Sequence, residues 1–156
     1  MEKQMSFSDL EYGARRKKTK RDKFLKRMDD ILPWDELSEM VRENYYKGRR
    51  GRKPQNIERM IRMFLLRQWF GLSDSAIEDA AFDSYAMKEF LGVSFSEGEQ
   101  VPDAATLYRF RKILAKNGID KMILDKVKEV LAKKGKALRR GNMTEPMFVK
   151  AAKKKK

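Results

Sequence analysis

The chain has 156 residues, enough for one domain with a sizeable buried core. It contains no cysteine and no histidine, which excludes disulfide scaffolds, Cys/His zinc sites, thiol chemistry and Ser-His-Asp or Cys-His catalysis. The formal net charge of +14 divides into +6 for residues 1–53, −1 for residues 54–132 and +9 for residues 133–156. A near-neutral body between basic ends is typical of a protein that binds a polyanion.

The N-terminal sequence lacks the apolar run of a signal peptide, and we expect a cytoplasmic protein. The most apolar stretch, residues 60–70, is interrupted by Arg62 and Arg67 and is too short to span a membrane. The basic ends also lack interleaved bulky apolar anchors. Nucleic acid is therefore favoured as the partner, and no membrane partner is expected.

Apolar residues recur with a helical period nearly throughout, and no segment alternates with period two over a strand's length. We therefore predict an all-α compact fold of about six to seven helices. Residues 1–18 form a basic N-terminal arm, and helices are predicted over residues 19–32 and 33–45. Pro33 ends the first of these helices and opens the second, because proline is tolerated in a first helical turn but not in an interior.

Residues 47–54, KGRRGRKP, are predicted to form a loop. Its exposed cations suit phosphate contact, although a merely solvated loop is nearly as consistent with the sequence. The cations concerned are Arg49, Arg50, Arg52 and Lys53.

The segment from 54 to 70 has an apolar arc too wide for one contact face, so we predict the central, most buried helix there, ended by Gly71. Ser73 caps the next helix, whose outer face is expected to carry four carboxylates. Such a cluster invites a metal or acid–base interpretation, but a solvated face explains it better. The four carboxylates are Asp74, Glu78, Asp79 and Asp83. A short helix over 84–91 and a loop over 92–100 follow.

The helix from Asp103 to Lys116 has two distinct faces. Leu107, Phe110 and Leu114 make an apolar stripe that must face a core. The other side is polar and basic, and such a helix can be held by its back with its front in a DNA major groove. An ordinary amphipathic helix with a solvated basic face is the alternative. The candidate DNA-binding residues here are Thr106, Tyr108, Arg109, Arg111, Lys112 and Lys116.

A last helix is predicted over residues 119–134, after which the apolar period disappears. We expect residues 135–156 to form a disordered basic tail, ending in four lysines that strengthen non-specific binding to polyanions. The body between the arm and the tail would then be residues 19–134.

Several landmarks in order give the chain a family resemblance: DILPW, the GRRGRKP loop, GLSDSAIEDA and PDAATLYRFR. Over roughly residues 5–141 the chain resembles the N-terminal domain of bacterial insertion-sequence transposases of the insertion-sequence-five group, which use a DDE catalytic core. The resemblance implies a helix-turn-helix-like domain that binds the terminal inverted repeats of a mobile element. The resemblance also implies that the helix from Asp103 is the DNA-recognition helix. It further implies that the protein is associated with the bacterial nucleoid.

The chain departs from the family after the last helix. Where the family has a strand of the form GT-x-V-D-A-T with the first catalytic aspartate, this chain has Glu145 followed by Pro146. Proline would remove a hydrogen-bond donor from a central strand. Two-metal phosphoryl transfer also needs several converging acidic ligands. We therefore expect no catalytic residues and no cofactor in this chain, with Mg²⁺ needed only if it is joined to a catalytic domain.

The main hypothesis is a DNA-binding domain of a transposase, truncated before the catalytic core, that binds transposon ends or regulates transposition. Its protein partners would be a second copy or a full-length transposase. The arm residues Arg15, Arg16, Lys17 and Lys18 would add salt-sensitive affinity. Two alternatives are the DNA-binding half of a split or frameshifted transposase and a helical protein-interaction module.

Overall fold

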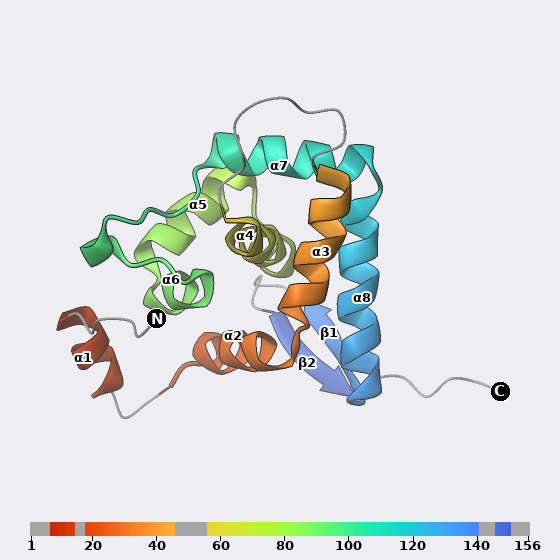
Figure 1. Ribbon diagram of the computed structural model, residues 1–156. Helices are drawn as coiled ribbons and strands as arrows, with labels where there is room; N and C mark the ends of the chain where they lie inside the picture. Colours follow the sequence, from red (N-terminus) through yellow and green to blue (C-terminus); the bar gives the residue numbers. More distant parts are fainter. Residues whose placement is uncertain (1–6, 15–17, 46–55, 141–145, 151–156) are drawn as a thin grey trace.

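The computed structural model describes residues 7–14, 18–45, 56–140 and 146–150 (Figure 1). Within these residues the chain forms eight α-helices, a short 3₁₀ helix η1 (Phe95–Glu97) and two short strands. The predicted all-α fold is confirmed, and the predicted helices between residues 19 and 134 are present with small differences at their ends. The helices are α1 (Phe7–Gly13), α2 (Lys20–Ile31), α3 (Trp34–Tyr45), α4 (Ile57–Phe70), α5 (Asp74–Asp83), α6 (Tyr85–Leu91), α7 (Ala104–Lys116) and α8 (Ile119–Lys133).

Local sequence determines where most of these helices begin. Five of them are preceded by a residue whose side-chain oxygen accepts a hydrogen bond from the backbone N–H three residues later, which satisfies an N–H that has no partner inside the helix. In α2 the cap is a full capping box, because the Asp22 carboxylate also accepts from the Thr19 backbone at 3.1 Å. The five capping residues are Thr19, Asn56, Ser73, Ser84 and Asp103.

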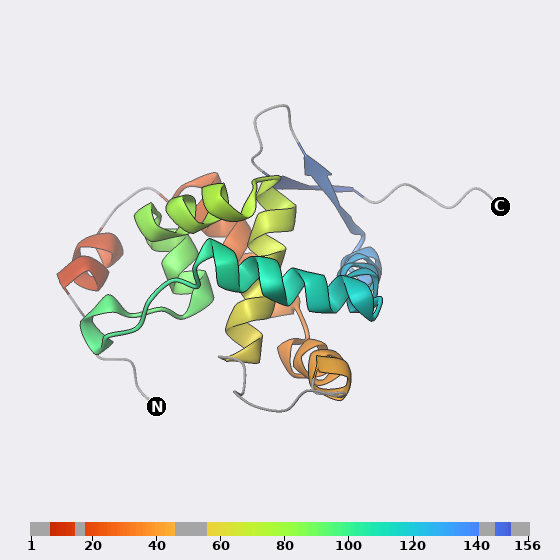
Figure 2. The ribbon, with the colours of Figure 1, turned by 90° about the horizontal axis from the view of Figure 1, so that it is seen from above.

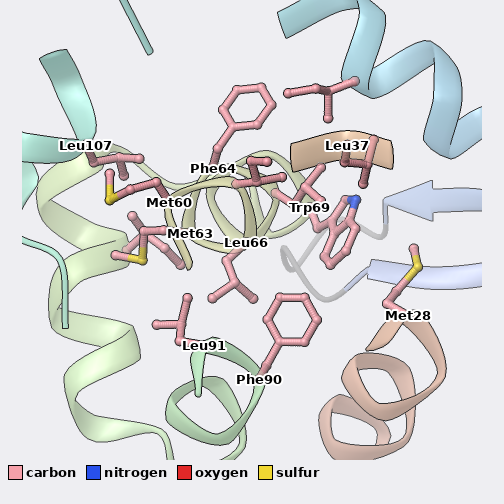
Figure 3. Packing of buried hydrophobic residues seen from close by; sticks show 14 of the residues in the cluster. Met28, Leu37, Met60, Met63, Phe64, Leu66, Trp69, Phe90, Leu91 and Leu107 are labelled. Atoms are coloured by element: carbon pink, nitrogen blue, oxygen red, sulfur yellow. The ribbon is translucent and has the colours of Figure 1, made fainter. Parts of the chain in front are cut away.

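α4 is the central helix, as its wide apolar arc predicts: nine of its 14 residues are buried. Figure 1 shows it nearly end-on, with the other helices of the body around it. Its side chains point outward in several directions, so that Met60 lies toward Leu107 of α7 while Leu66 lies toward α6 (Figure 3). α4 therefore supplies much of the common core, and α3, α5, α6 and α7 pack directly against it.

α7 and α2 lie on opposite sides of α4 (Figures 1 and 2). α7 turns Leu107, Phe110 and Leu114 into the core, each at most 2% exposed. On the other side, the Phe24 ring of α2 meets the Trp69 ring of α4 edge-on at a centroid distance of 5.4 Å. Because both helices bury their apolar faces toward α4, their polar faces point in opposite directions.

The C-terminal region corrects one prediction. The sequence pattern predicts a disordered tail over residues 135–156, but within this range β1 (Lys136–Arg140) and β2 (Pro146–Lys150) pair as an antiparallel two-stranded sheet. Both strands are edges of this sheet, and Pro146 is the first residue of β2, a position where a strand tolerates proline. Five-residue strands carry too few alternations to be recognised by period alone. The four lysines 153–156 lie outside the described residues.

The N-terminal arm also contains structure that the sequence pattern did not predict. α1 lies within it, and the Tyr85 hydroxyl of α6 donates a hydrogen bond to the Asp9 carboxylate of α1. Across the described ranges, no helix is both long and apolar enough to cross a membrane.

Candidate nucleic-acid interface

The exposed face of α7 carries an aromatic ring among cations. Tyr108 is 48% exposed, and Arg109, Lys112 and Lys116 are exposed as well. The Lys112 ammonium nitrogen lies 5.4 Å from the centre of the Tyr108 ring, within range of a cation–π interaction. Three cations at helical spacings i, i+3 and i+7 therefore form one stripe along the helix, with the Tyr108 ring beside it.

The start of α7 is fixed by two carboxylates from different elements. Asp103 caps it by accepting from the Thr106 backbone N–H at 2.7 Å, and this hydrogen bond holds the pKa of Asp103 below its ordinary value. Glu78 of α5 accepts from the Ala104 backbone N–H. Negative charge at a helix N-terminus is favourable, so α5 holds α7 at the end where the helix begins.

Arg111 is placed differently from the other predicted cations of α7. Its guanidinium forms a two-pronged contact with Asp74 of α5, with Nε–Oδ1 and Nη2–Oδ2 distances of 2.8 and 2.6 Å. Arg67 of α4 reaches the same carboxylate, with Nε 2.9 Å from Oδ1. The hydrogen bond from Arg111 and the charges of both guanidiniums hold the pKa of Asp74 below its ordinary value. Asp74 thus links α4, α5 and α7 inside the domain, with Arg111 as its partner on α7.

The predicted acidic face of α5 is therefore divided. Asp74 and Glu78 are turned toward α7 and have specific partners, whereas Asp79 and Asp83 are exposed as predicted. The first pair sits at positions i and i+4, one face of a helix, and this spacing was a signal available in the sequence. No group of three or more acidic residues that could hold a metal ion is found in the ranges that the structure describes.

Several cations of the helical body, in contrast to those of the α7 stripe, are paired with carboxylates. Three ion pairs show this. The Arg59 Nη2–Glu99 Oε2 distance is 2.6 Å, the Arg62 Nη1–Asp29 Oδ1 distance is 2.7 Å, and the Lys126 Nζ–Glu36 Oε1 distance is 3.0 Å. Arg109, Lys112 and Lys116 form no ion pair within the described part of the chain; Arg109 makes only a long contact of 3.4 Å to the Thr106 hydroxyl. Intramolecular pairing therefore leaves the α7 stripe available to an external anion.

Most of the remaining residues that were predicted to contact phosphates lie outside the described part of the chain. Arg15, Arg16, Lys17, Arg49, Arg50, Arg52 and Lys53 all lie outside the described residues. Lys18 is described and is exposed just before α2. Three further cations, Lys23, Lys26 and Arg27, are exposed on α2 and are not among the predicted DNA-binding residues. Their spacing was readable from KRDKFLKR, but a basic helix face alone is a weak signal.

Together these features define a small all-helical domain that presents an outward basic helix, α7, fixed by its apolar side and by ion pairs. The chain belongs to the family described as a transposase domain (DUF772), whose model matches residues 14–113. The matched region reaches from the N-terminal arm into α7 and includes Tyr108, Arg109 and Lys112. It therefore covers most of the helical body and most of the α7 stripe. No solved structure matches the chain.

Proposed function

We propose that the chain binds duplex DNA through α7, as the part of a transposase that recognises the terminal inverted repeats of a mobile element. The α7 stripe supports this proposal most directly, because its three cations form no ion pair within the described residues, whereas Arg111 on the same helix is paired with Asp74. A surface cation without an internal partner is available to replace the counterions of DNA phosphates. A single helix is also the element that the major groove admits.

The residues of the stripe suit different contacts. Arg109 and Lys112 suit contacts with base edges, because Arg and Lys pair with the acceptors of guanine. Lys116, at the far end of the helix, suits the phosphate backbone, and Tyr108 suits either a base edge or a phosphate. Arg111 is left out of this set because Asp74 already occupies its guanidinium.

The arrangement of α5 and α7 supports a DNA-recognition motif of the helix-turn-helix type. α5 packs against α7 and holds its N-terminus through Glu78, as the first helix of such a motif supports the recognition helix. The connection differs from a short turn, since α6 and η1 are inserted between the two helices. The proposed motif is therefore an elaborated form in which α6 also contributes core residues such as Phe90.

The test compares a duplex carrying the element's terminal inverted repeat with a scrambled duplex of equal length, by fluorescence anisotropy over a range of salt concentrations. Replacing Arg109 and Lys112 by alanine should weaken binding to the cognate duplex by about ten-fold or more, since one good base contact contributes about 1–3 kcal/mol of discrimination. The scrambled duplex should lose less affinity, so that the ratio of the two dissociation constants falls.

A matched control removes two exposed lysines of α8 instead, Lys121→Ala with Lys128→Ala, and should leave this ratio unchanged. Equal losses on both duplexes would reduce α7 to a phosphate-binding surface. Absence of any salt-sensitive DNA complex with the unaltered chain would overturn the proposal.

Protein association is a second candidate function, supported by exposed aromatic side chains. The rings of Phe82 and Phe95 lie 5.2 Å apart and are 53% and 38% exposed, and Phe7 of α1 is 87% exposed. Exposed apolar groups of this kind suit contact with a second copy or with a full-length transposase, through which the chain would regulate transposition. Sedimentation analysis at several concentrations distinguishes this candidate, because a pure interaction module associates without DNA and binds none at low salt.

A further inference from the structure

A second basic surface lies on α2, far from α7. Lys20, Lys23, Lys26 and Arg27 are all exposed, and Lys18 is exposed just before the helix. None of these five residues forms an ion pair with another residue whose position is described. We call these residues the α2 basic face. Like the α7 stripe, it consists of cations left available to an outside anion.

Two of the four carboxylates near the α2 basic face are engaged with other groups. Asp22 serves the capping box with Thr19, and Asp29 is paired with Arg62 of α4. Asp30 and Glu89 remain, against five cations. A groove of about 380 Å³ between α2 and α6 is lined by both groups of charges, with Phe90 and Ala86 among its apolar residues. The groove itself is lined by four cations and four carboxylates, so its charge is balanced. The positive excess lies along α2, where residues 18–30 include six basic and three acidic side chains, and this excess favours an anion along the exposed side of the helix.

The direction of the α2 basic face matters as much as its charge. α2 and α7 both bury their apolar sides toward α4 and lie on opposite sides of it (Figures 1 and 2). Duplex DNA is stiff, with a persistence length of about 150 base pairs. A duplex bound along α7 would have to bend sharply around the domain to reach α2, at a large cost in deformation energy.

We propose that the α2 basic face binds the phosphate backbone of a second DNA duplex, so that one copy of the chain bridges two duplexes. This inference rests on the proposed function, which assigns the first duplex to α7. Apart from its cations, the exposed side chains of α2 are the carboxylates Asp29 and Asp30, and no exposed amide or aromatic group accompanies them, so the second duplex is bound through its phosphates without sequence preference. No exposed large apolar side chain accompanies these cations on α2, which argues against an anionic membrane as the partner.

The experiment is a bridging assay with the full chain. A duplex carrying the terminal inverted repeat is fixed to beads, the protein is added, and retention of a second, fluorescent duplex of random sequence is measured. The test variant is Lys23→Ala with Arg27→Ala, two exposed residues one helical turn apart. It should lower retention of the second duplex by about ten-fold, because binding through backbone contacts depends steeply on the number of phosphates neutralised.

The same variant should bind a single inverted-repeat duplex with an affinity within about two-fold of the unaltered chain, because α7 is untouched. The matched control is again Lys121→Ala with Lys128→Ala on α8, which should bridge normally. Circular dichroism and thermal melting check that the exposed substitutions leave the fold intact.

The possible outcomes are distinguishable. If the α2 variant bridges as well as the unaltered chain, bridging arises from a dimer with two α7 helices and the inference is overturned. If bridging and single-duplex affinity fall together, α2 contacts the same duplex as α7 and the inference is again wrong. An unaltered chain that binds one duplex but never retains a second also overturns it. Failure to bind even one duplex overturns the proposed function itself.

Discussion

Asp74 is the residue whose replacement tests the internal architecture of the interface most directly. Its side chain is 15% exposed, and the two guanidiniums that it joins, Arg67 and Arg111, are 23% and 26% exposed. At an effective dielectric constant of about 20, two unit charges 4 Å apart attract by about 4 kcal/mol, and desolvation offsets much of this. Exposed ion pairs contribute about 0–1 kcal/mol, and breaking a buried one costs about 3–5 kcal/mol.

For Asp74→Asn we therefore expect a loss of about 2–3 kcal/mol in the free energy of unfolding, between these limits. At roughly 4 °C per kcal/mol for a domain of this size, the melting temperature should fall by about 8–12 °C. Asp79→Asn is the matched control on the same helix, because Asp79 is exposed. It should change stability by no more than about 0.5 kcal/mol. Urea titration measures both variants.

The dependence on pH provides an independent check. The pKa of Asp74 is lowered in the folded state, so its contribution is fully present above the pKa of an unfolded aspartate, about 3.9, and is lost as pH falls through the folded value. The stability difference between the unaltered chain and Asp74→Asn should thus be constant from about pH 5 to 8 and shrink below about pH 4. Equal stability of the Asp74 and Asp79 variants, or a difference that persists at low pH, would refute this reasoning.

Three further predictions concern local structure. Thr19→Ala removes the capping box with Asp22 and should lower the free energy of unfolding, measured by urea titration, by about 1 kcal/mol. Amide exchange in the first turn of α2 should become faster, and an unchanged urea midpoint would contradict this prediction. Gly71 ends α4 at φ 64°, a left-handed conformation that alanine adopts less readily than glycine or asparagine. Gly71→Ala should therefore lower the free energy of unfolding by about 1 kcal/mol, and Gly71→Asn by less. Equal melting temperatures for the two variants would refute the backbone argument. Tyr85→Phe removes the hydroxyl that donates to Asp9, so amide exchange in α1 should accelerate while global stability changes little; unchanged exchange there would show that other contacts hold α1.

Most of the helices could be predicted because their signals are local. The apolar period of α4, the proline before α3 and the capping residues act within a few positions of one another. The hairpin could not be predicted in this way, since each five-residue strand depends on a partner across the intervening segment. α1 was missed because its seven residues provide too short a pattern.

The candidate site divides along the same line. The sequence alone determined that α7 has an apolar side and a basic side, because both follow from the helical period. Only the tertiary structure decided which cations remain available, since Arg109 and Arg111 stand two positions apart and yet only Arg111 meets a carboxylate. Asp74 lies far from Arg111 along the chain, and packing of α5 on α7 brings them together. α2 and α7 bury their apolar sides toward α4 from opposite sides, so their basic sides point in opposite directions (Figure 1). Ion pairing and orientation depend on distances in space, which no local pattern encodes.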